Sequence, residues 1–137
     1  MNYDFYDDMN AFNNYISFDN YNKLDVFNPY EGYSKGNAFK NEYIPYKDYK
    51  IVKPNIDNEK DEMLVNIGQY SFMMHDMNLY LDVFPNDREA LDKFTEYRNK
   101  TNELIAKYER KYGPLAIKGS VSNNPPFNWI SFWPWVK

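Results

Sequence analysis

The sequence has no cysteine and a single histidine, and each fact excludes particular kinds of bond and catalytic or metal site. Without cysteine there can be no disulfide, no thiolate metal site and no cysteine nucleophile. One histidine cannot supply the two Glu-x-x-His motifs of a di-metal bundle. The five glycines form no phosphate-binding loop. We therefore expect a protein that is not an enzyme, with no catalytic residue, no cofactor and no metal of its own.

Long apolar runs and an excess of positive charge are also missing. No stretch approaches about 18 apolar residues, so we expect no membrane span. The N-terminal residues 1–8 are acidic and lack the basic and apolar regions of a signal peptide, so we expect no signal peptide. A net charge of −4 argues against a dedicated nucleic-acid binder.

Aromatic side chains are abundant, at 20% of the residues. Residues 1–28 consist mainly of Asn, Asp, Tyr and Phe, and we interpret them as a low-complexity arm. This arm is either disordered in the free protein or docks its rings on a neighbour. Residues 29–56 carry Pro, Gly, Tyr and Lys, which favour turns and an extended path over a long helix. Binding of single-stranded nucleic acid by this basic segment is a weaker interpretation, because it contains no arginine.

From residue 57 the pattern becomes helical. Asp57 or Asn58 can cap a first helix, and Pro85 ends it. Apolar residues recur along this helix at alternating spacings of four and three, which predicts a seam that packs against a partner. The seam residues are Met63, Ile67, Tyr70, Met74, Met77, Leu81 and Phe84.

A second helix follows at once. Asn86 is the predicted N-cap with Glu89 as its capping-box partner, and Gly113 ends the helix. So short a connection predicts an antiparallel two-helix hairpin over residues 57–115. The second seam comprises Ala90, Phe94, Tyr97, Thr101, Leu104 and Tyr108.

The predicted fold class is mainly α, with the hairpin flanked by an irregular or extended N-terminal region and an irregular, aromatic-rich C-terminal tail. Two helices alone bury their apolar stripes poorly, so a second copy, a partner or the tail must complete the core. Residues 116–137 are a linker and tail that hold all three tryptophans. The tail either covers the hairpin as a lid or inserts into a partner. Its candidate contact residues are Trp129, Phe132, Trp133, Pro134 and Trp135.

His75 is the one residue that suggests an enzyme. It precedes Asp76, and a histidine beside carboxylates can be a metal ligand or a general base. A solvated or interface histidine is the commoner arrangement. The alternative function that this residue leaves open is a small metal- or peroxide-active enzyme.

Several short motifs follow one another in the second half of the chain: residues 77–82, 85–87, 90–91, 108–109 and 111–115, then Trp129 and residues 133–135. In this order they resemble the CotJB family of spore coat proteins, over about residues 60–137. Upstream, Pro29, residues 36–39 and residues 43–46 are more weakly similar to the CotJA family, over residues 29–55.

The resemblance implies a structural protein of endospore-forming bacteria, made in the mother cell and laid into the spore coat. It also implies a manganese-catalase-like partner of the CotJC type, which would hold the metal. We therefore expect a coat component that self-assembles, as a homo-oligomer, and anchors or organises that catalase. A second structural alternative is that the Tyr-rich arm, with Tyr3, Tyr6 and Tyr15, is a substrate for oxidative crosslinking.

Overall fold

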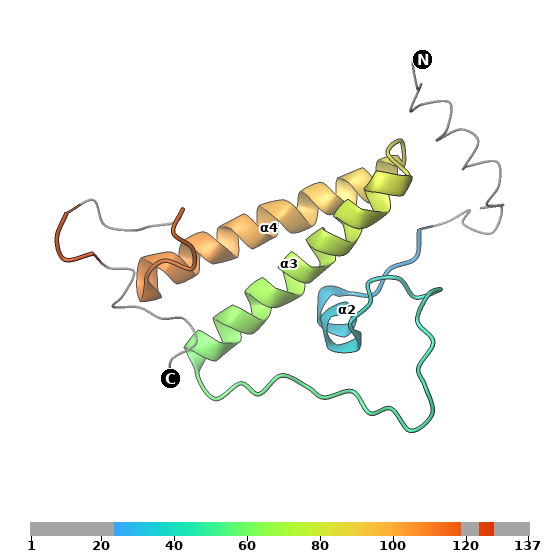
Figure 1. The fold of residues 1–137 in the computed structure, drawn as a ribbon, viewed down its shortest axis with the longest axis horizontal. Helices are drawn as coiled ribbons and strands as arrows, with labels where there is room; N and C mark the ends of the chain where they lie inside the picture. Colours follow the sequence, from blue (N-terminus) through green and yellow to red (C-terminus); the bar gives the residue numbers. More distant parts are fainter. Residues whose placement is uncertain (1–23, 119–123, 128–137) are drawn as a thin grey trace, which may run out of the picture.

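The computed structural model describes residues 24–118 and 124–127. Three helices form within these residues: α2 (Pro29–Lys35), α3 (Glu59–Val83) and α4 (Arg88–Tyr112). Helices α3 and α4 pack against each other and are joined by a short corner, while α2 packs against α3 (Figure 1). The described residues form no strand longer than an isolated bridge between Val26 and Phe39. The mainly helical fold class predicted from the sequence is confirmed for this part of the chain.

Helix α2 departs from the extended path predicted for residues 29–56. Asn28 caps it by accepting a hydrogen bond from the Glu31 N–H at 2.9 Å, and Pro29 occupies the first turn, where its missing N–H costs nothing. Gly36 ends the helix in the left-handed region, at φ 71°. Proline and glycine therefore bound a short helix here. The content of proline and glycine argues against a long helix, but their order, with proline first and glycine last, suits a short one.

Capping side chains set the ends of the long helices. Asn58 starts α3, with its side chain accepting from the Asp61 N–H at 2.9 Å. Asp87, and not the predicted Asn86, starts α4 by accepting from the Ala90 N–H at 3.0 Å. The Asp87 N–H donates to the Phe84 carbonyl and closes a turn that includes Asn86. Asn86 therefore lies before the helix, and the predicted capping box with Glu89 does not form.

The core lies towards the corner of the helix pair. Both α3 and α4 contribute to it, and so does the segment on either side of α2, which supplies Leu24 and Ala38. The remaining core residues are Met73, Met77, Ala90 and Tyr97. One face of α3 thus meets α4, while another is covered by residues 24–40 of the same chain.

Candidate interaction surface

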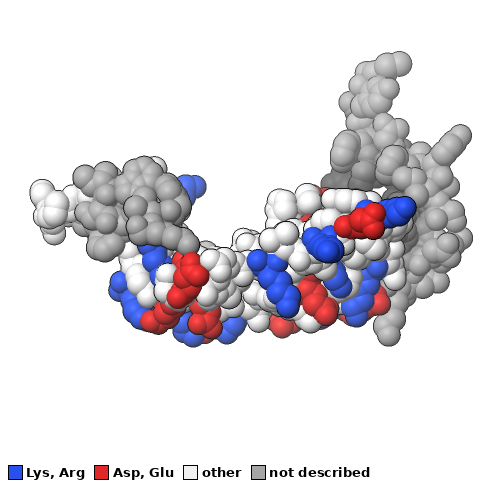
Figure 2. All heavy atoms as spheres, turned by 90° about the horizontal axis from the view of Figure 1, so that it is seen from below, with Lys and Arg blue, Asp and Glu red and all other residues white. Residues whose placement is uncertain are grey.

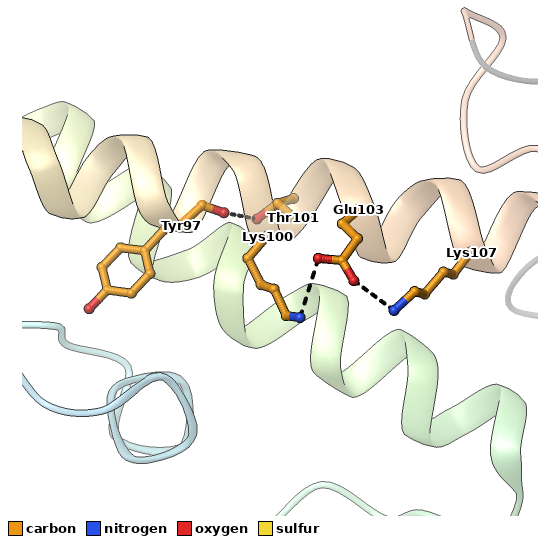
Figure 3. A network of polar contacts seen from close by, with 5 residues as sticks. All are labelled: Tyr97, Lys100, Thr101, Glu103 and Lys107. Atoms are coloured by element: carbon orange, nitrogen blue, oxygen red, sulfur yellow. Dashed lines mark hydrogen bonds and ion pairs between the residues drawn. The ribbon is translucent and has the colours of Figure 1, made fainter.

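The predicted seam of α4 faces the inside of the molecule. Ala90, Tyr97, Thr101 and Tyr108 are buried, and Phe94 and Leu104 are half-buried. The Thr101 hydroxyl lies too deep to reach water and donates to the Tyr97 carbonyl at 2.8 Å (Figure 3). This hydrogen bond satisfies the hydroxyl within its own helix.

The predicted seam of α3 is less deeply buried. Met77 is buried, whereas Met63, Ile67, Tyr70, Met74, Leu81 and Phe84 are half-buried. The buried stripe instead runs through Gln69, Met73 and Met77. The reason is that α3 has apolar residues around most of its circumference, so spacing alone could not show that a second face would be covered.

Residues 24–40 cover that second face through close contacts. Ala38 N–H donates to the Asp76 carboxylate at 3.0 Å, which ties the segment to the middle of α3. The Tyr33 ring lies so close to Gly68 that a Cβ there would stand 3.0 Å from its hydroxyl oxygen. A Cβ on Gly32 would stand 2.6 Å from the Met73 sulfur. Sequence reasoning missed these residues, although an isolated glycine in a helical pattern is a known sign of close packing.

The corner of the helix pair is held by one carboxylate. Asp87 caps α4 and also accepts a hydrogen bond from the Tyr80 hydroxyl at 2.9 Å. The Tyr80 ring in turn packs against Phe39 and Phe84, with centroids 5.5 and 4.7 Å apart. The corner, α3 and the N-terminal segment therefore share a single contact point.

Charged side chains occupy the outer surface. Glu103 lies between Lys107 and Lys100, at 2.6 and 3.4 Å (Figure 3). The hydrogen bond from Lys107, followed by that from Lys100, holds the pKa of the Glu103 carboxyl below its usual range. At the open end of the pair, Lys111 of α4 bridges to Glu59 of α3, and this hydrogen bond raises the pKa of Lys111. On the face seen in Figure 2, cationic and anionic side chains are interspersed.

Two buried tyrosines have altered acidity. Burial raises the pKa of Tyr97, and the nearby Glu96 carboxylate adds to the effect. Burial also raises the pKa of Tyr108, with a smaller contribution from Tyr112, whose ring centroid is 5.1 Å away. In both cases the protein favours the neutral phenol.

His75 is exposed on α3. Its neighbour Asp76 is engaged by the Ala38 N–H. Within the described ranges, no group of three or more His, Cys, Asp or Glu side chains is placed to hold a metal ion. The described helices also include none that is long and apolar enough to cross a membrane.

The tail residues predicted to make contacts lie outside the described residues. These are Trp129, Phe132, Trp133, Pro134 and Trp135. What the structure does bring together is a helix pair whose apolar faces are partly covered. Exposed apolar side chains remain on both long helices, at Leu79, Val83 and Leu91.

Comparison with known proteins identifies the family of the chain. No curated protein and no solved structure matches the chain. The family model described as CotJB protein matches residues 61–136, which include α4, nearly all of α3 and the tail. The weaker CotJA resemblance lies outside this match. Because the match spans more than half of the 137 residues, the chain belongs to the CotJB family of spore coat-related proteins.

Proposed function

We propose that this protein is a non-enzymatic component of the endospore coat that self-assembles and anchors or organises a manganese-catalase-like coat protein. The observation that carries the proposal is the match to the CotJB family across α3, α4 and the tail. We further propose that the protein is made in the mother cell and joins the coat there, with the metal chemistry supplied by the partner.

The surface of the helix pair supports this role. The seam of α3 is half-buried along most of its length, and Leu79, which lies on α3 outside the seam, is 50% exposed. A helix pair of this kind gains stability when a further apolar surface covers it. The tail adds three tryptophans, the residue type that most often anchors protein interfaces. We propose that the seam and the tail together form the contact surface.

Co-purification tests the partner. The catalase-like protein is co-expressed with the wild-type chain and with a Trp133→Ala, Trp135→Ala variant. We expect the double variant to retain less than a tenth of the bound catalase. A Tyr46→Ala variant, which also removes a ring but lies outside the family match, serves as the control and should bind normally. Equal retention by all three chains would remove the tail from the interface.

A second candidate function is oxidative crosslinking through tyrosine. One observation favours it: the Tyr46 and Tyr49 rings lie 4.9 Å apart, and Tyr46 is 73% exposed. A one-electron oxidant, such as a peroxidase with hydrogen peroxide, would remove one hydrogen atom from each phenol, and the two radicals would couple through a new carbon–carbon bond. Mass spectrometry of oxidised protein tests this. Absence of peptides joined at Tyr46, Tyr49 or the arm residues Tyr3, Tyr6 and Tyr15 would count against the role.

A further inference from the structure

Residues 44–56, which we call the connector, concentrate exposed apolar surface. Ile44, Val52 and Tyr46 are 87%, 84% and 73% exposed, and Tyr49, Ile51 and Ile56 are also exposed. The connector thus holds six of the twelve large apolar residues that are exposed in the described part of the chain. Apolar surface gathered in this way marks a site that another surface covers.

The backbone of the connector is open as well. The connector has no regular secondary structure. Ile51 and Lys53 line a pocket together with residues of α2, while the rest of the connector runs apart from the helices between α2 and α3 (Figure 1). Its backbone makes one hydrogen bond with the described residues, from the Tyr49 N–H to the Tyr46 carbonyl at 3.1 Å. Most side chains and backbone groups of the connector are therefore accessible to a partner.

The charge of the connector indicates which partner it fits. Lys47, Lys50 and Lys53 outnumber its single acidic residue, Asp48. Residues 1–22 have the opposite composition, with four aspartates, seven tyrosine or phenylalanine rings and no lysine or arginine. The two segments are complementary in charge, and both carry apolar side chains for contact.

The structure also holds together the residues that follow the first segment and those that precede the connector. Residues 25–27 pair with residues 38–40 through hydrogen bonds of 2.9 Å from the Phe27 N–H to the Ala38 carbonyl and 3.1 Å from the Lys40 N–H to the Asp25 carbonyl. The Lys40 ammonium and the Asp25 carboxylate add an ion pair of 3.2 Å. Because both segments leave from this one point, the effective concentration of one near the other is high, on the order of millimolar.

We propose that residues 1–22 fold onto the connector of the same chain and cover its apolar side chains. The antiparallel pairing of residues 25–27 with residues 38–40 puts Asp25 and Lys40 at the same end of the pair. A turn closed by the Tyr43 N–H and the Lys40 carbonyl separates this pairing from the connector. In the proposed contact, the rings of residues 1–22 cover Ile44, Ile51 and Val52, and the aspartates of residues 1–22 lie beside the lysines of the connector. The contact is therefore made by side chains and not by one continuous strand pair.

Amide hydrogen exchange on the full chain and on a chain lacking residues 2–22 tests the proposal. We expect amides in the connector to exchange at least ten times faster in the shortened chain, with those of α3 and α4 unchanged. Equal exchange in the two chains would overturn the proposal. Protection that rises with protein concentration would also overturn it, because a second copy would then be the cover.

Charge reversal supplies an independent test. A Lys47→Glu, Lys50→Glu, Lys53→Glu variant of the full chain should lose the same protection, and changing Asp4, Asp7 and Asp8 to lysine in that variant should restore it. The control reverses Lys60, Lys93 and Lys118, which lie outside the connector and change the net charge equally. Equal loss of protection in the control would show that net charge, and not this contact, is responsible.

Discussion

Met73 is a single side chain on which the packing of α2 against α3 depends. It is fully buried on α3, at the face that residues 24–40 cover, and Gly32 of α2 approaches its sulfur closely. Methionine suits such a position because it is unbranched and fills irregular space. Its neighbour Met74, which the four–three spacing selects as the seam residue, is only half-buried.

Replacing each of the two methionines with alanine shows whether Met73 or Met74 contributes more to the stability of the core. Met73→Ala removes a side chain with no exposed surface, so we expect the free energy of unfolding to fall by about 2–5 kcal/mol. Met74→Ala should cost less than half as much, because its side chain already meets solvent. Urea unfolding followed by circular dichroism measures both. A larger loss for Met74→Ala would mean that the seam, and not the face towards α2, carries the core.

The buried phenols make stability depend on alkaline pH. The folded chain raises the pKa of Tyr97 and Tyr108 above the value of about 10 that tyrosine has when unfolded. Above that pH the unfolded state loses protons that the folded state keeps, so stability is fully present below about pH 10 and falls as pH rises further. Unfolding measured from pH 8 to 11 should show this decline. It should be shallower in a Tyr97→Phe variant, and an unchanged slope would contradict the assignment.

At the scale of the helix, the caps are the features that the sequence predicts best. Gly113 was predicted from residue type and position, and Asn58 was one of the two predicted caps of α3, because short polar side chains and glycine are favoured there for local reasons. The corner was harder. Asn86 and Asp87 are equally good caps in isolation. The structure uses Asp87, whose carboxylate also accepts from the Tyr80 hydroxyl, seven residues away.

Asp87→Ala should therefore destabilise the protein more than Asn86→Ala. Asp87 caps α4 through the Ala90 N–H and accepts from Tyr80, so its replacement removes two hydrogen bonds, and we expect a cost of about 1–2 kcal/mol. Asn86→Ala should change the free energy of unfolding by less than about 0.5 kcal/mol. Adding Tyr80→Phe to each variant isolates the hydroxyl contact. Equal costs for the two alanine variants would restore Asn86 as the cap.

At the scale of the whole molecule, helix content and the position of the long helices follow from periodicity, but the covering of α3 does not. Nothing in the spacing of Gly32, Tyr33 and Ala38 shows that they dock on Gly68, Met73 and Asp76, because this contact joins segments some 40 residues apart. The candidate interaction surface, too, could be predicted from the sequence only in part. The seam residues were found by their regular spacing in the sequence, whereas the exposed apolar residues of the connector have no regular spacing.

Association through the helix pair is the remaining consequence of the proposed coat role. Leu79 is 50% exposed, so Leu79→Lys removes apolar contact surface with little cost to the core. If the protein self-assembles through the exposed side of α3 that carries Leu79, sedimentation velocity should show the wild type as an assembly and Leu79→Lys as a smaller species with the same helix content.

Asn78→Lys is the matched control, since Asn78 is the adjacent exposed residue and the added charge is the same. The control should assemble like the wild type, because it removes no apolar surface. Equal dissociation of both variants would assign the effect to charge. A wild-type monomer that enters a complex only with the catalase-like partner would replace the self-assembling scaffold with an adaptor that needs its enzyme.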